Sequence, residues 1–182
     1  APIDASKAVT TGPAPNSRCM PILTTRGPTK NGGIYSKTSK SAGKSMADDV
    51  VLNKAASIER RLARICEEYG GKREHLYENQ TKQDAIVLNL QRACETAIDL
   101  AMYVVRRNGL GLPQESRDAF ALLEKAQLLS AELAGRLQRM VGFRNVAVHE
   151  YTRLNPDIVQ AIITKHLDDF RRFSPTIVKA CA

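Results

Sequence analysis

Apolar residues recur at helical spacing from Asp48 onward. In the first such stretch they follow the three-and-four spacing that places an apolar stripe along one side of a helix. The stripe consists of Val51, Leu52, Ala55, Ile58, Leu62 and Ile65. The string "YGG" at 69–71 is predicted to end this helix, because glycine readily adopts the left-handed conformation that closes helices.

A second, longer helix is predicted from about Thr81 to Asn108, with Gly109 as its stop. Its apolar stripe contains Ile86, Leu90, Ala93, Cys94, Ala97, Leu100, Ala101 and Val104. The following string "GLGLPQES" is typical of a loop, and Ser116 is the predicted cap of a third helix that begins near Arg117.

The remaining apolar positions predict one broken helix or two short helices up to Gly142, and then a last helix. The first group is Leu122, Leu123, Ala126, Leu129, Leu133, Leu137 and Met140. Asn155 is the predicted cap of the last helix, with Pro156 in its first turn and its end at Ser174, before Pro175. No convincing period-two run occurs in the sequence. The pattern therefore predicts an all-α bundle of four to five helices.

Residues 1–45 differ from the rest of the chain in composition and pattern. They are rich in Gly, Pro, Ser, Thr and Lys and show no sustained period. Such a segment buries too little apolar area to offset its ordering entropy, so we predict a disordered basic tail over 1–45 and a helical domain over 46–182. Met46 is a plausible natural start, preceded by added or upstream-translated sequence. The alternative is a basic arm that binds RNA.

The net charge of +8 lies mostly in this tail. Residues 1–45 contain seven Lys or Arg and one acid, which leaves 20 bases and 18 acids for residues 46–182. The basicity of the whole chain is therefore poor evidence for nucleic-acid binding. The four cysteines, Cys19, Cys66, Cys94 and Cys181, form no C-x-x-C pair, and no apolar run is long enough to span a bilayer. We expect a reduced, cytoplasmic protein.

The string "GFRNVAVHEYTRL" at 142–154 contains the side chains best suited to catalysis. Arg144 and His149 are five residues apart, about 140° around a regular helix. They share a face only if the helix ends or kinks between them, or if the reach of arginine closes the gap. Asn145 and His149 do face alike, and an amide beside an imidazole can fix its tautomer.

These residue types suit phosphodiester cleavage without a metal. Histidine can take the proton from a ribose 2′-hydroxyl or give one to the leaving oxygen, and arginine offers a planar fork to the phosphate oxygens. His149 would supply one such group per chain, so a symmetric dimer would supply both acid and base. The alternative is that His149 is a capping or core histidine and Arg144 is a solvated charge at a helix end.

Other residues are weaker candidates for a functional site. His75 is predicted to be a solvated loop residue, and His166 a surface or capping residue. Glu95 and Asp99 lie one turn apart, but nothing completes a metal ligand set, so a solvated or interface face is the better interpretation and neither metal nor cofactor is expected. The candidates for phosphate contacts are Arg106, Arg107, Arg136 and Arg139, with ordinary helix-end charges as the alternative.

The string "RNVAVHEY" matches an R-x4-H-x-Y motif, and in this helical context the chain resembles the HepT-like branch of the HEPN superfamily. The resemblance covers about Asp48 to Phe173 and has no counterpart for residues 1–45. The strings "KQDAIVLNLQRACETAIDLAMYVV", "GLGLPQESRDAFALL" and "LAGRLQRMVGFRNVAVHEY" look like successive helices of that family.

The resemblance implies a dimerising all-α fold and a bacterial toxin–antitoxin system. It implies that Arg144 and His149 form the active site of a metal-independent endoribonuclease in a cleft at the dimer interface, with Asn145 as the polar second residue. It also implies that an MntA-like nucleotidyltransferase antitoxin attaches AMP to Tyr151 and so switches the toxin off. The alternative from another class is a non-catalytic helical module that binds a nucleotide or a partner nucleotidyltransferase.

Overall fold

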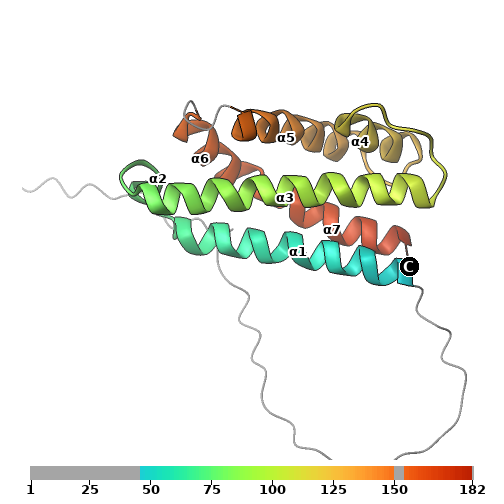
Figure 1. Cartoon of the computed structure of the whole chain (residues 1–182), viewed down its shortest axis with the longest axis horizontal. Helices are drawn as coiled ribbons and strands as arrows, with labels where there is room; N and C mark the ends of the chain where they lie inside the picture. The colour runs from blue at the N-terminus through green and yellow to red at the C-terminus, as the bar shows by residue number, and fades with distance from the viewer. Residues whose placement is uncertain (1–45, 150–153, 182) are drawn as a thin grey trace, which may run out of the picture.

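The computed structural model describes residues 46–149 and 154–181, and every regular element within them is a helix (Figure 1). The elements are α1 (Met46–Tyr69), α2 (Glu74–Tyr77), α3 (Gln80–Arg107), α4 (Ser116–Lys125), α5 (Ala131–His149), α6 (Pro156–Lys165) and α7 (Leu167–Cys181). The predicted all-α class is confirmed. The described residues form seven helices rather than the four to five predicted. None of these helices is long and apolar enough to cross a membrane.

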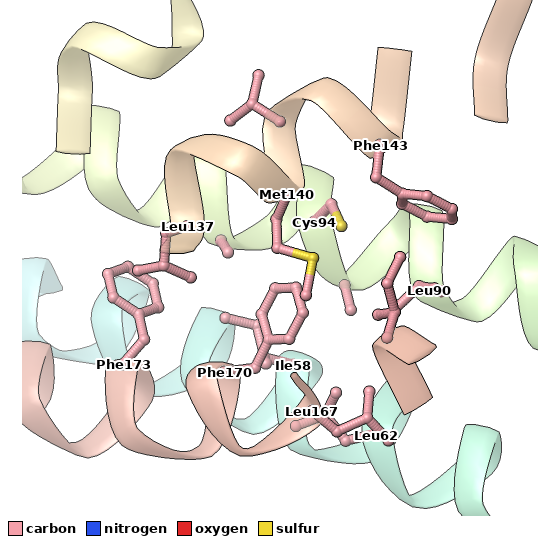
Figure 2. Close-up of a cluster of buried hydrophobic side chains, with 14 of the residues drawn as sticks. Ile58, Leu62, Leu90, Cys94, Leu137, Met140, Phe143, Leu167, Phe170 and Phe173 are labelled. Carbon is pink, nitrogen blue, oxygen red and sulfur yellow. The ribbon is translucent and has the colours of Figure 1, made fainter. Parts of the chain in front are cut away.

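Helix α3 is the central element of the bundle. It packs against α1 on one side and against α4 and α5 on the other, while α7 contacts α1, α3 and α5 and closes the bundle (Figure 1). The core lies where these four long helices meet (Figure 2), with α1 contributing Ile58 and Leu62, α3 Leu90 and Cys94, α5 Leu137, Met140 and Phe143, and α7 Leu167, Phe170 and Phe173. Phe120 of α4 meets Phe173 edge to face, with ring centroids 5.8 Å apart.

The first two predicted helices are confirmed as α1 and α3. Helix α1 ends at Tyr69, and Gly70 and Gly71 follow with φ of 55° and 72°. Helix α3 ends at Arg107, close to Gly109, whose φ is 61°. The left-handed backbone that only glycine adopts without strain therefore stops both helices where the sequence predicts.

Two expectations about α4 and α5 are wrong. Ser116 does not cap α4: Glu115 is the capping residue, and the Asp118 carboxylate accepts hydrogen bonds from the backbone N–H groups of Gln114 and Glu115, each at 2.9 Å. The next helix does not end at Gly142 but continues to His149. Phe143 and Ala147 are buried beyond the glycine, and their packing outweighs its weak helix propensity.

The predicted last helix is in fact two helices. The chain breaks at His166, between α6 and α7, where the imidazole Nδ1 lies 3.0 Å from a carboxylate oxygen of Asp169. Asn155 caps α6 as predicted. Pro175 does not mark the end, since α7 continues through it to Cys181. Buried Phe173 and Ile177 hold the helix in place on both sides of the proline.

His75 is not the solvated loop residue that the sequence indicates. It lies on α2, is partly buried, and its Nδ1 is 3.0 Å from the backbone oxygens of Glu68 and Tyr69. The ring therefore ties this short helix to the end of α1.

Candidate functional site

Arg144, Asn145 and His149 lie in the last two turns of α5. The helix is unbroken from Ala131 to His149, so the kink that would bring Arg144 and His149 onto one face is absent from this part of the chain. Arg144 is partly buried, whereas Asn145 and His149 are exposed. The exposure of His149 rules out a core histidine and leaves the choice between a reactive residue and a helix-end residue.

Arg144 is held against α3 by Glu95. Its Nε and Nη2 both donate to Glu95 Oε1, at 3.3 and 3.2 Å, and Gln91 Nε2 donates to the same oxygen at 3.2 Å. Both charged side chains keep about a third of their surface exposed, 32% for Arg144 and 37% for Glu95. The guanidinium is therefore fixed at the α3–α5 junction and remains accessible from solvent.

Asn145 connects this pair to the face of α5 that carries His149. Its Oδ1 accepts a hydrogen bond from Arg144 Nη1 at 3.3 Å. Around the helix Asn145 lies between the two motif residues and only about 40° from His149. Because the Arg144 side chain extends toward Asn145, its guanidinium lies closer to the His149 side of the helix than the backbone positions of Arg144 and His149 suggest. Among the described residues, the Asn145 amide makes no hydrogen bond to the His149 ring. The contact by which Asn145 was expected to fix the imidazole tautomer is therefore not observed.

The four arginines predicted to contact phosphates lie in different environments. Arg106 and Arg107 are in the last turn of α3, about 18 Å along that helix from Glu95, and Arg107 Nη2 donates to the Cys181 backbone oxygen. Arg136 forms ion pairs with two carboxylates: its Nη1 lies 3.0 Å from Asp169, and its Nη2 pairs with Glu132. The hydrogen bond to Asp169 raises the pKa of Arg136. Arg139 is exposed on α5.

The paired carboxylates of α3 each have a cation as partner. Glu95 binds Arg144, and Asp99 lies 3.2 Å from Lys54 Nζ. Over the described ranges no three His, Cys, Asp or Glu side chains gather into a metal site. The role of Glu95 as the partner of Arg144 was not predicted, because the two residues are 49 positions apart and no local pattern signals their contact.

Burial next to this pair changes the chemistry of Cys94. Its thiol is enclosed in the core, and that desolvation, followed by the nearby negative charge of Glu95, raises its pKa to about 12. Cys94 is therefore a packing residue and not a nucleophile. Tyr151, the predicted modification site, lies outside the described residues.

Residues 58–177 match the model of the family described as ribonuclease HepT-like. The chain belongs to this family. The mRNA nuclease HepT of Shewanella oneidensis is 44% identical over 130 residues, which cover 71% of this chain and 97% of the relative. The tRNA nuclease HepT of Aphanizomenon flos-aquae is 32% identical over 81 residues, covering 44% of this chain and 55% of the relative.

Solved structures of HepT-like proteins have the same fold. A tri-AMPylated Shewanella oneidensis HEPN toxin in complex with an MNT antitoxin is 44% identical, with a TM-score of 0.68, and the match covers 72% of this chain and 98% of that one. A toxin–antitoxin structure with AMP-PNP is 43% identical with a TM-score of 0.69 and the same coverage. The predicted family is confirmed, and α1 to α7 form the HepT-like bundle.

Proposed function

We propose that the chain is the endoribonuclease toxin of a toxin–antitoxin pair, with Arg144 and His149 as its catalytic residues. The observation that carries the proposal is the pairing at the α3–α5 junction. Glu95 and Asn145 orient the guanidinium of Arg144, next to the exposed end of α5 where His149 stands. Membership in the HepT-like ribonuclease family and the nuclease names of two relatives support the same activity.

In the proposed reaction His149 transfers protons and Arg144 stabilises charge. The imidazole takes a proton from a ribose 2′-hydroxyl, and the oxygen attacks the adjacent phosphorus. Negative charge builds on the non-bridging oxygens, where a guanidinium forms charge-assisted hydrogen bonds. A second imidazole protonates the leaving 5′-oxygen. No metal enters the proposed step.

A homodimer supplies that second imidazole. Leu88 of α3 and Val148 of α5 are exposed, at 43% and 39% of their surfaces. The core pairs Leu90 with Phe143 and Cys94 with Met140 show that α3 and α5 run antiparallel (Figure 2). Leu88 and Val148 therefore both lie beyond the Arg144–Glu95 pair toward the same end of the bundle. Exposed apolar residues beside a functional site favour self-association over that face.

The proposed regulator is a nucleotidyltransferase antitoxin of the MntA kind, acting through Tyr151. Solved relatives are complexes with an MNT antitoxin, and one of those toxins is tri-AMPylated. Tyr151 follows His149 by two residues, so AMP attached to its phenol would place an anion near Arg144 and repel an RNA phosphate.

The activity is tested with His149→Ala and Arg144→Ala. Each should lower the rate of RNA cleavage by about 10²–10⁴-fold, and each should abolish growth inhibition while the helical content and dimer persist. Arg60→Ala on α1, a surface arginine remote from α5, is the matched control and should cut RNA like the parent. Cleavage should continue in EDTA.

The same assay separates the two function classes. Cleavage by either motif variant at the parental rate, or loss of cleavage on chelation alone, would disprove the mechanism. A parent that binds RNA or nucleotide but never cleaves RNA would support the non-catalytic module instead.

A further inference from the structure

Arg117 is a surface arginine of α4 whose side chain lies directly against α5. It is exposed, and its Nη2 is 3.0 Å from the position that a Cβ atom would occupy on Gly142. Helices α4 and α5 lie side by side (Figure 1). The absence of a side chain at residue 142 thus allows a guanidinium to approach the surface of α5 closely.

The surface beneath Arg117 continues to the candidate catalytic histidine. Gly142, Asn145 and His149 are spaced i, i+3 and i+7 and so lie along one side of α5. Gly142 and His149 are about 10 Å apart along the helix axis. A nucleic-acid strand whose reacting phosphate is at His149 can therefore bring a neighbouring phosphate to Arg117.

Helix stability does not explain the place of Arg117. It occupies the first turn of α4, where the helix dipole disfavours a positive charge. Asp118, the acid that follows it in the sequence, accepts hydrogen bonds from the backbone of the preceding turn. Among the described residues Arg117 makes no hydrogen bond or ion pair, so its five N–H donors remain available to a ligand.

A second cation extends the same surface. Arg139 precedes Gly142 by three residues, is exposed, and its Nη1 would lie 3.9 Å from a Cβ on Gly135. Like Arg117, it makes no hydrogen bond or ion pair with a described residue. Arg136, by contrast, is neutralised by Glu132 and Asp169.

We infer that Arg117 is a substrate-binding residue: it binds a backbone phosphate of the RNA strand next to the one that is cleaved, with Arg139 further along the same path. The inference rests on the proposed ribonuclease function and names a contact that the R-x4-H-x-Y motif does not contain. A guanidinium suits a phosphate because its planar fork donates two parallel hydrogen bonds to two phosphate oxygens.

The test measures binding separately from cleavage. A fluorescent single-stranded 2′-O-methyl oligoribonucleotide of mixed sequence, which lacks the attacking hydroxyl and cannot be cleaved, is titrated with the parent chain, Arg117→Gln and Arg60→Gln over a series of salt concentrations. Arg117→Gln should weaken binding about tenfold at low salt, the effect of one charge-assisted hydrogen bond. It should also reduce the slope of log affinity against log salt by about one. Arg60→Gln changes the net charge equally and should match the parent.

In a cleavage assay with total cellular RNA, Arg117→Gln should raise KM and leave kcat within about threefold of the parent, because uniform binding is lost. Equal affinity and equal salt slope for Arg117→Gln and Arg60→Gln would overturn the inference. So would normal RNA binding by Arg117→Gln together with lost neutralisation by the antitoxin, since Arg117 would then be a protein contact. A parent that binds RNA through Arg117 and fails to cleave it would refute the proposed function alone.

Discussion

Arg144 and Glu95 form a two-point contact in which two nitrogens of one guanidinium, Nε and Nη2, share a single carboxylate oxygen. The contact joins two residues, one on α3 and one on α5, that are 49 positions apart in the sequence. It fixes the plane of the guanidinium and directs Nη1 toward Asn145. Glu95 is thus a positioning residue for the arginine that the proposed mechanism requires.

Removal of Glu95 should damage catalysis more than stability. We expect Glu95→Ala to lower kcat for RNA by roughly tenfold, because the arginine remains but is no longer oriented. Glu95→Gln retains the acceptor oxygen and should recover most of the rate. The melting temperature should hardly change, since an ion pair this exposed contributes little. Steady-state kinetics and thermal unfolding of both variants check this, and equal losses in the two variants would contradict it.

Asp169 should be the opposite case, a residue needed for stability. It is buried, with 1% of its surface exposed, and its two oxygens accept from Arg136 Nη1 and pair with His166 Nδ1, each at 3.0 Å. We expect Asp169→Ala to lower the free energy of unfolding by about 2 kcal/mol, since two polar partners lose their acceptor. Its neighbour Asp168, whose side chain is 40% exposed and pairs with Arg171, is the control.

Denaturant unfolding measures both aspartate variants. Asp168→Ala should cost about 1 kcal/mol, less than Asp169→Ala, because solvent reaches the Asp168 carboxylate and screens its ion pair. If the two variants unfold at the same denaturant concentration, the buried carboxylate does not hold α5 and α7 together.

Thiol reactivity should report the enclosure of Cys94. Because burial raises its pKa to about 12, almost no thiolate exists at pH 8, and iodoacetamide reacts with the thiolate. We expect Cys94 to remain unmodified in the folded protein and to react after denaturation, whereas the partly exposed Cys181 reacts in both states. Peptide mass spectrometry of the alkylated chain distinguishes the two sites. Equal rates at Cys94 and Cys181 in the folded chain would show that the α3–α5 junction opens.

Deletion of residues 1–45 should leave the melting temperature and the proposed dimer essentially unchanged, because a segment of that composition contributes little to a core. It removes a net charge of +6, so retention of nonspecific RNA at low salt should weaken. Thermal unfolding, size-exclusion chromatography and RNA retention of the truncated chain are the measurements. A large fall in stability would place the domain boundary upstream of Met46.

Tyr151 should be the site of AMP attachment. Co-expression with the cognate nucleotidyltransferase should add one or more AMP units to the peptide that contains Tyr151, with loss of toxicity, because the attached phosphate competes with RNA for Arg144. Tyr151→Phe should stay toxic and escape neutralisation. Intact and peptide mass spectrometry check the modification. Full neutralisation with an unmodified tyrosine would show that the antitoxin works by covering Arg144 and His149.

The sequence by itself determined the helical class and the two longest elements. The stripes around Ile58 and Leu90 follow the helix period, and both are buried in the core because that period places them on one side. Gly70 and Gly109 mark the ends because a positive φ is a local property of the backbone. The candidate catalytic residues Arg144 and His149 were also chosen from the sequence, since their identity and spacing are local, and their role stays a prediction.

Only the tertiary structure decided where the later helices end and what the charged residues contact. Gly142 stays helical because Phe143 and Ala147 are buried against other helices, and α7 passes Pro175 for the same reason. Glu95 with Arg144, and Arg117 with Gly142, are contacts between helices distant in the sequence. A periodic pattern records which side of a helix is apolar, but the partner of a polar side chain depends on how the helices are placed against one another.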